Sequence, residues 1–149
     1  MNESASCEIS TDRQRLDVAL IHQFLSTSYW ARGIPRKVVE QCIENSLCFG
    51  AFVAGRQVGF ARIVSDFASF AYLADVFVVE EHRGKGIGKQ LIQAVVDHPR
   101  LQGLRRILLA TKDAHGLYAR FGFRPLTNPE HFMSVHRPDI YKQSGTKGF

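Results

Sequence analysis

The stretch that decides the fold is VFVVEEHRGKGIGKQLIQAVV, residues 76–96. It begins as an apolar, β-branched run that is typical of a buried strand, and it ends with apolar residues spaced along one face of a helix. Between the two lie three glycines within five residues, Gly84, Gly86 and Gly88. A strand that enters a helix through such a turn presents the unpaired amides of the first helical turn, together with the positive end of the helix dipole, to an anion such as phosphate.

The spacing of these residues separates three kinds of phosphate-binding loop. A Walker A loop needs one more residue between Gly84 and Gly88, and it needs a hydroxyl where this chain has Gln90. A dinucleotide fingerprint, G-x-G-x-x-G, opens a parallel unit, whereas this loop reads G-x-G-x-G after strands that form a meander. The pattern that fits is R-x-x-G-x-G, with Arg83, Gly86 and Gly88. The alternative is a plain glycine-rich turn with a solvated basic fringe.

This loop resembles the pyrophosphate-binding motif of the GNAT superfamily of acetyl-CoA-dependent N-acyltransferases. A second stretch, TKDAHGLYARFGF at residues 111–123, resembles the helix after strand five in the same superfamily, N-x-x-A-x-x-L-Y-x-x-x-G-F. Thr111 stands where the superfamily usually has asparagine. The positions that match are Ala114, Leu117, Tyr118, Gly122 and Phe123.

The order of the remaining elements fits the same superfamily. We predict an α/β (α+β) fold in which a mixed, mostly antiparallel central sheet is flanked by helices, with residues 1–149 as a single domain. The expected elements are a strand at 7–10, helices near 16–24 and 38–43, a three-stranded antiparallel meander over 47–79, a helix from 87 that ends before Pro99, a strand at 105–111, a short helix at 113–121 and the entry to another strand at 122–127.

Composition limits the function classes. With 149 residues, 45% hydrophobic and 22% charged, the chain is long enough for a core without disulfides or metal. Its three cysteines lack a C-x-x-C pair and its histidines lack i, i+4 spacing, so we expect no metal site. The N-terminus lacks a signal or lipidation pattern, which predicts a cytoplasmic protein without a membrane partner. The net charge of +5 favours an anionic partner, but no motif predicts nucleic-acid binding.

The resemblance implies how acetyl-CoA would bind. Backbone amides of the loop would hold the pyrophosphate, with the loop cations adding charge. The backbone of Phe77, Val78 and Val79 would pair with the pantetheine arm, and Thr111 would contact that arm through a hydroxyl where asparagine has an amide. The loop residues assigned to the pyrophosphate are Arg83, Gly84, Lys85, Gly86, Ile87, Gly88 and Lys89.

The resemblance also implies catalytic roles. Tyr118 matches the tyrosine that assists the departing thiolate, although a tyrosine here could simply pack against the FGF corner. Asp75, a carboxylate in the apolar run YLADVFVV, is the candidate base. The alternatives are a water chain as the base, or a carboxylate at the open end of the strand that is bonded to a neighbouring hydroxyl or cation. Acceptor contacts are predicted from the aromatics Tyr29, Trp30, Phe67, Phe70 and Tyr72, with Asp66 as a cation partner; the aromatics could equally be core residues.

The predicted function is therefore N-acetyl transfer from acetyl-CoA to a primary amine, on a small-molecule acceptor, by direct attack in a ternary complex. The alternative is a non-catalytic acyl-CoA sensor or interaction module that keeps the cofactor site. Members of the superfamily are often dimers, so a homodimer is an expected assembly.

Overall fold

A five-stranded sheet with the order β1-β2-β3-β4-β5 runs through the computed structural model, which describes residues 6–142. The first four strands pair antiparallel with their neighbours, and β5 pairs parallel with β4. The mixed, mostly antiparallel sheet predicted from the sequence is confirmed. The strands are β1 (Cys7–Ser10), β2 (Leu47–Val53), β3 (Arg56–Ser65), β4 (Phe70–Val78) and β5 (Arg106–Leu109).

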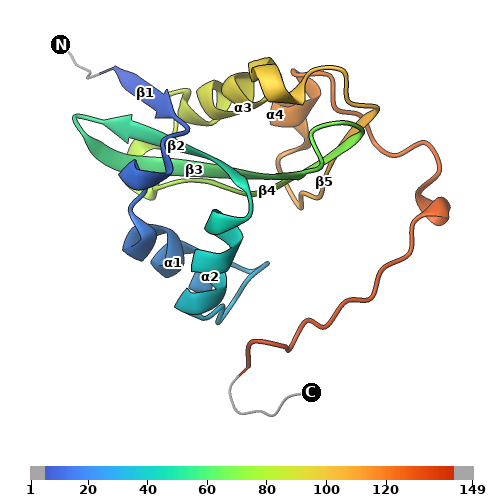
Figure 1. Ribbon diagram of the computed structural model, residues 1–149, viewed down its shortest axis with the longest axis horizontal. Helices are drawn as coiled ribbons and strands as arrows, with labels where there is room; N and C mark the ends of the chain where they lie inside the picture. The colour runs from blue at the N-terminus through green and yellow to red at the C-terminus, as the bar shows by residue number, and fades with distance from the viewer. Residues whose placement is uncertain (1–5, 143–149) are drawn as a thin grey trace.

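Helices cover both faces of the sheet. Figure 1 shows α1 and α2 on one side, and α3 with α4 on the other. The α-helices are α1 (Val18–Ser26), α2 (Arg36–Glu44), α3 (Ile87–Asp97) and α4 (His115–Ala119). Short 3-10 segments lie between or after these elements: η1 (Arg13–Arg15), η2 (Glu80–His82), η3 (Pro99–Leu101) and η4 (Pro129–His131).

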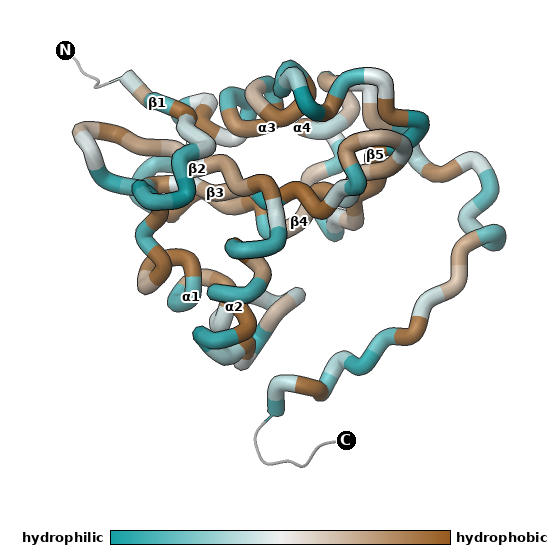
Figure 2. Tube along the Cα trace, viewed as in Figure 1, coloured by the Kyte–Doolittle hydropathy of each residue, from teal (hydrophilic) through white to brown (hydrophobic). Residues whose placement is uncertain are grey.

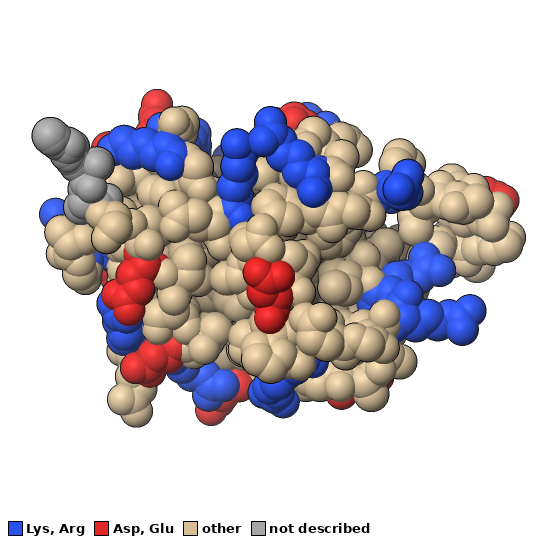
Figure 3. All heavy atoms as spheres, turned by 90° about the horizontal axis from the view of Figure 1, so that it is seen from above, with Lys and Arg blue, Asp and Glu red and all other residues tan. Residues whose placement is uncertain are grey.

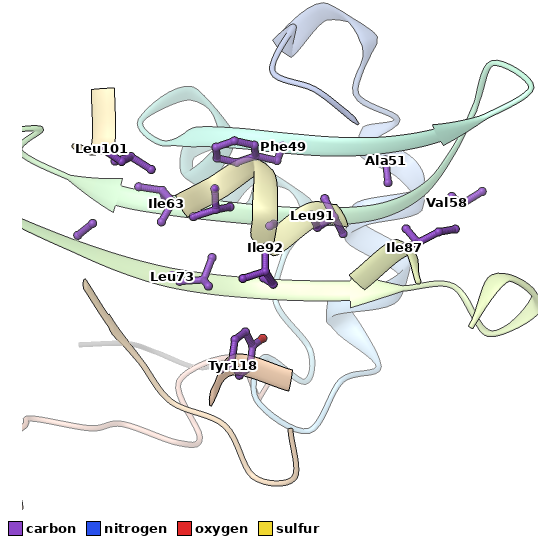
Figure 4. Packing of buried hydrophobic residues seen from close by; sticks show 13 residues of the cluster. Phe49, Ala51, Val58, Ile63, Leu73, Ile87, Leu91, Ile92, Leu101 and Tyr118 are labelled. Carbon is purple, nitrogen blue, oxygen red and sulfur yellow. The ribbon is translucent and has the colours of Figure 1, made fainter. Parts of the chain in front are cut away.

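The core on the α3 side follows from the helical spacing seen in the sequence. Leu91, Ile92 and Val95 of α3 are fully buried against Phe49 and Ile63 of the sheet, as Figure 4 shows for the labelled members of this cluster. The helix ends at Asp97 because Pro99 follows two residues later. This packing fixes the start of α3, and therefore the glycine loop, against the end of β4.

A second core lies between the sheet and the first two helices. Ile21 of α1 and Val39 of α2 pack on Phe60 and Phe77. Phe24 stacks on Phe77, with ring centroids 4.0 Å apart. The connection between α1 and α2, residues 27–35, is thereby held over the middle of β4.

Two irregularities in β4 shape the site. The β3–β4 register shifts between Phe60 and Arg62, which leaves a bulge at Asp75. The β4–β5 ladder begins at Phe70 and ends at the pair Leu73 and Leu109, so the second half of β4 has no partner on that side. The two strands consequently open into a split.

The strand predicted to begin in GFRPLT, residues 122–127, does not form within residues 6–142. Pro125 has no amide hydrogen to donate to a neighbouring strand, and the chain leaves the body of the protein there. Every residue from 127 to 140 is exposed, and Figure 1 shows this segment as an arc that stands away from the sheet.

Candidate active site

The glycine loop joins the end of β4 to the start of α3. Gly84 and Gly86 have φ of +79° and +83°, and Gly86 is the N-cap of the helix. This left-handed conformation is unfavourable for residues with a Cβ, so glycine is required at both positions by the backbone. The loop can therefore turn sharply and start α3 while its amides still face outward.

The amides of this loop are free to bind a ligand. The first helical bond runs from the Gln90 amide to the Gly86 carbonyl at 3.1 Å, and within residues 6–142 the amides of residues 84–89 donate to no acceptor. A Cβ added at Gly88 would meet only a Leu117 methyl carbon at 3.8 Å, so the chain itself leaves space there. Unpaired amides at the positive end of α3 form a site for an anion such as a pyrophosphate.

Three cations surround these amides. Lys85 and Lys89 are exposed, and the Arg83 Nε donates to the Val78 carbonyl at 2.9 Å, which anchors that side chain to the end of β4. On the face covered by α3 and α4, Figure 3 shows basic side chains in separate groups, with acidic ones elsewhere on the same face. This pattern favours a local anion site over a broad nucleic-acid surface.

The backbone directions at the open edge of β4 narrow the prediction that Phe77, Val78 and Val79 all pair with the pantetheine arm. The Val79 amide donates to the Val58 carbonyl at 2.8 Å, and the Val79 carbonyl accepts from the His82 amide at 3.0 Å. Since antiparallel pairs alternate, Phe77 also directs its backbone toward β3, while Val78 directs its backbone toward the open edge. Three consecutive residues cannot all face one edge, so of the three only Val78 faces the open edge, where its carbonyl accepts from Arg83 Nε and its amide remains directed outward.

A pocket of about 650 Å³ lies at the split between β4 and β5. It is lined by residues from the α1–α2 connection, the middle of β4 and the segment from β5 into α4. Several predicted site residues meet here, although they are far apart in sequence. They are Tyr29, Trp30, Tyr72, Asp75, Thr111 and Tyr118.

Asp75 is held in the pocket wall by two charge-assisted contacts. Its backbone has φ of +58°, a strained conformation that the bulge imposes. The carboxylate accepts from Arg62 Nε and from Trp30 Nε1, both at 2.8 Å, and its side chain is only 10% exposed. Arg62 in turn donates to Ser46 Oγ at 3.0 Å. This network fixes the indole of Trp30 over the pocket.

Tyr118 is buried beneath the pocket, and Figure 4 shows it under the strands of the core. Burial raises the pKa of its hydroxyl to about 12, with Tyr29 adding to the rise. The hydroxyl therefore keeps its proton near neutral pH and has no hydrogen-bond partner in the described part of the chain. A protonated phenol without a partner can donate to a developing thiolate.

Thr111 lies where β5 leads into α4. Its hydroxyl oxygen accepts from the Ala114 amide at 3.0 Å, which caps the turn before α4. The hydroxyl hydrogen can still be donated, because a threonine hydroxyl donates and accepts at the same time. The substitution of threonine for the usual asparagine thus keeps both the cap and one donor at the pocket.

The prediction of Asp66 as an acceptor contact is not supported by its position. Its carboxylate accepts from the Ser69 hydroxyl at 2.6 Å and from the amides of Ala68, Ser69 and Phe70, and these bonds hold its pKa well below the usual range. Asp66 therefore closes the β3–β4 turn, outside the residues that line the pocket. Phe67 lies in the same turn, under the Arg100 guanidinium at 3.8 Å.

Arg62, Lys112 and Tyr141 are among the residues that line the pocket and that sequence reasoning missed. The Lys112 Nζ stands 5.0 Å from the centre of the Tyr29 ring. Arg62 could have been found, because it is a charged residue in an apolar strand next to the strand that holds Asp75, and buried charges occur in pairs. No sequence signal places Tyr141, which reaches the pocket from the end of the chain.

Residues 6–142 contain neither a cluster of metal-binding side chains nor a helix that could span a membrane. No group of three or more His, Cys, Asp or Glu side chains in this range could hold a metal ion. None of the helices in the same range is long and apolar enough to cross a membrane.

Comparison with known sequences gives a consistent family. The profile of the acetyltransferase (GNAT) family matches residues 18–123. A relative from Gibberella zeae that is named as an acetyltransferase is 30% identical over 135 residues, which cover 75% of this chain and 75% of the relative. The streptothricin acetyltransferase of Escherichia coli is 33% identical over 105 residues, covering 68% of this chain and 60% of that protein.

Comparison with solved structures agrees. A crystal structure from Xanthomonas campestris, described as an acetyltransferase of the GNAT family, has a TM-score of 0.90 and 55% identity, covering 93% of this chain and 98% of that one. An acetyltransferase from Clostridium acetobutylicum, crystallised with acetyl-CoA, has a TM-score of 0.65 and 16% identity, covering 89% of this chain and 96% of that one. The second likeness concerns the fold alone.

Proposed function

The chain belongs to the GNAT acetyltransferase family and is an acyltransferase, and from this premise we propose that it transfers the acetyl group of acetyl-CoA to a primary amine of a small molecule. The family uses acetyl-CoA. The proposal is supported by three features that occur together: the unpaired amides of residues 84–89, the open edge of β4 at Val78, and the pocket with Tyr118 at the β4–β5 split.

In this proposal, the loop holds the pyrophosphate of acetyl-CoA. The amides of residues 84–89 supply hydrogen bonds, and Arg83, Lys85 and Lys89 supply positive charge. Val78 offers its backbone amide to the pantetheine arm, since its carbonyl accepts from Arg83 Nε, and Thr111 offers its hydroxyl hydrogen further along. These contacts direct the thioester into the split, toward the pocket that contains Tyr118.

The acceptor is proposed to enter the pocket of about 650 Å³ from the side of Tyr29 and Trp30. These two rings meet edge to face with centroids 5.1 Å apart, and they are 57% and 43% exposed, so they offer apolar surface to an acceptor. The carboxylate of Asp75 lies beside these rings, because it accepts a hydrogen bond from Trp30 Nε1. A small molecule with an amine near an apolar part matches this wall.

The transfer step uses Tyr118 and Asp75 in different ways. The neutral amine nitrogen forms a bond to the thioester carbonyl carbon, the carbon–sulfur bond breaks, and Tyr118 donates a hydrogen bond to the thiolate that leaves. One Asp75 oxygen accepts from Trp30 Nε1 and the other from Arg62 Nε, so we assign Asp75 to orienting the amine. The proton of the amine then passes to water in the open pocket.

The test is release of free thiol from acetyl-CoA in the presence of a panel of small primary amines. Loss of one hydrogen bond to a charged sulfur corresponds to about 1.5–3 kcal/mol, so Tyr118→Phe should lower kcat roughly 10- to 100-fold without weakening coenzyme A binding. Tyr72→Phe is the matched comparison, because it removes a hydroxyl from the acceptor side of the same pocket and should raise the acceptor KM rather than lower kcat. Tight binding of acetyl-CoA without turnover for any amine would favour the non-catalytic sensor.

A further inference from the structure

A second pocket lies at the end of the sheet where β1 stops. The β1–β2 ladder ends at the pair Ser10 and Gly50, so β1 does not cover the first residues of β2. A pocket of about 560 Å³ opens there, between η1, the end of α2, the β3–β4 turn and η3. It shares no lining residue with the proposed acceptor pocket, and its volume is typical of a small-molecule site. Figure 2 shows that the chain is hydrophilic in η1 and at the end of α2.

Two arginine side chains line this pocket, Arg13 and Arg100. The Arg100 guanidinium lies over the Phe67 ring, 3.8 Å from its centre, which restricts the side chain to one face of the pocket. Within residues 6–142, neither guanidinium donates a hydrogen bond to another side chain or to a carbonyl oxygen. Both groups are therefore available to an anion in the pocket.

His98 adds a donor whose orientation is set by the fold. Its Nδ1 accepts from the Arg100 amide at 3.1 Å, and its ring meets the Phe49 ring edge to face with centroids 5.6 Å apart. Burial, followed by the charge of Arg100, lowers the pKa of His98, so the ring is mostly neutral at pH 7. A neutral imidazole that accepts at Nδ1 carries its hydrogen on Nε2, which makes Nε2 a hydrogen-bond donor.

Ser46 joins this pocket to the network that holds Asp75. Its hydroxyl oxygen accepts from Arg62 Nη1 at 3.0 Å, so its hydrogen remains available to a ligand. Arg62 donates to Asp75 at 2.8 Å, and Asp75 accepts from Trp30 Nε1 at 2.8 Å. Cys48 of this pocket stands opposite Arg62 of the acceptor pocket in the β2–β3 register. The two pockets therefore lie on either side of one strand pair and are connected by hydrogen bonds.

One lining side chain opposes an anion. Glu44, the last residue of α2, places a carboxylate in the lining. Two guanidinium groups against one carboxylate still leave the lining positively charged when His98 is neutral. The last carbonyl oxygens of α2 are a smaller obstacle, because Asn45 and Ser46 donate to two of them.

We propose that this pocket is a regulatory site for a small phosphate monoester, and that its occupancy alters the setting of Trp30 through Ser46, Arg62 and Asp75. A ligand that accepts from the Ser46 hydroxyl acts on the same oxygen that anchors Arg62. Because Trp30 forms part of the acceptor wall, the ester and the acceptor should change each other's affinity. That last effect rests on the proposed function, whereas binding of the ester and the response of Trp30 do not.

The arrangement of the donors favours phosphate over carboxylate. A carboxylate is planar, and a single guanidinium satisfies both of its oxygens. A phosphate group is tetrahedral and accepts from several directions. The donors here come from separate elements, with Arg13 on η1, Ser46 before β2, and His98 and Arg100 at η3.

Titration calorimetry with glycerol 3-phosphate measures the site. Coenzyme A is titrated first and kept at saturation, so that the glycine loop is filled and a failure of the loop to bind is seen separately. We expect a dissociation constant below about 1 mM for the ester and no heat with glycerol. Arg100→Gln should weaken binding roughly 10-fold or more, and Glu44→Gln should strengthen it by removing the opposing charge.

Arg56→Gln is the matched control. Arg56 is an exposed arginine at the β2–β3 turn and lines neither this pocket nor the acceptor pocket, so the variant should bind the ester as the wild type does. Circular dichroism shows whether each variant is folded. A wild-type dissociation constant above about 10 mM would overturn the proposal, and so would an Arg100→Gln variant that binds like Arg56→Gln.

Fluorescence tests the connection between the pockets without requiring turnover. The chain has a single tryptophan, Trp30, so its emission reports on the acceptor wall alone. Saturating glycerol 3-phosphate should shift this emission in the wild type. Ser46→Ala should abolish the shift while still binding the ester within about 10-fold of the wild type, since it removes one neutral hydrogen bond. Binding with unchanged emission in the wild type, or a shift that persists in Ser46→Ala, would show that the site is not coupled and would overturn its regulatory role.

Discussion

Replacing Gly86 by alanine separates what the backbone requires from what a ligand requires. Gly86 has φ of +83°, and Gly103, in the turn before β5, has φ of +77°. A Cβ added at either glycine would meet no atom of the chain within 4 Å. Gly86→Ala and Gly103→Ala therefore introduce the same backbone strain and the same methyl group into open space, one at the proposed pyrophosphate loop and one far along the chain.

The two substitutions should have similar effects on stability. Placing an L-residue in the left-handed region costs about 1–2 kcal/mol. For a domain of this size, 1 kcal/mol corresponds to roughly 2–4 °C in the melting temperature. Both variants should therefore melt roughly 2–8 °C below the wild type, and a thermal scan followed by circular dichroism measures this difference.

Their effects on cofactor binding should differ. A methyl group at residue 86 would occupy the space beside the free amides of residues 84–89 and displace a phosphate from at least one of them. One charge-assisted bond corresponds to about 1.5–3 kcal/mol, or roughly a 10- to 150-fold rise in the dissociation constant. Titration calorimetry with coenzyme A measures it. The reasoning fails if Gly86→Ala binds coenzyme A as tightly as Gly103→Ala does.

Further predictions concern the charged groups and the buried phenol. Asp75→Asn should raise the acceptor KM about 10-fold while the pH profile of kcat keeps its shape; a change in the acidic limb, where a general base becomes protonated, would instead identify Asp75 as the base. Arg62→Leu removes the cation that pairs with the largely buried Asp75 and should lower the free energy of unfolding, measured by urea titration, by about 3 kcal/mol. The double variant Arg62→Leu/Asp75→Leu, which also removes the buried carboxylate, should regain most of that stability. Asp66→Ala should lower the melting temperature at pH 7. Because hydrogen bonds lower the pKa of Asp66 in the folded protein, its carboxylate stabilises the fold above about pH 4 and loses this contribution as it is protonated at lower pH. The difference in melting temperature between variant and wild type should therefore shrink below about pH 4. With its pKa raised to about 12, Tyr118 should cause no loss of kcat through ionisation up to about pH 10, which a rate profile in overlapping buffers would check.

The cofactor side of the site could be predicted because it depends on local sequence. The positive φ of Gly84 and Gly86 and the free amides at the start of α3 all lie within a few consecutive residues. The prediction that Phe77 and Val79 pair with the pantetheine arm treats three consecutive strand residues as equivalent, although the direction of the backbone groups alternates along a strand. That alternation depends on which neighbour each residue pairs with, and for Val79 the neighbour is Val58, 21 residues away in the sequence.

The acceptor side could be predicted only in part. The aromatic residues of the α1–α2 connection were identified, and the structure brings Tyr29 and Trp30 to the pocket. Asp66 was assigned to the same wall because it is a carboxylate in a turn near aromatics. In the structure, that carboxylate accepts from the Ser69 hydroxyl and from neighbouring amides, and these bonds close the turn. Asp66 therefore has a local structural role.

The sequence by itself determined the order of strands and helices, the glycine loop and the identity of the buried faces, since periodicity and glycine conformation are properties of short segments. Only the tertiary structure decided that Arg62 and Trp30 both donate to the carboxylate of Asp75, and that β4 and β5 separate after Leu73. It also decided that residues 127–140 form no strand of the sheet. Each of these depends on contacts between segments distant in the chain, whose free energy no single stretch of sequence contains.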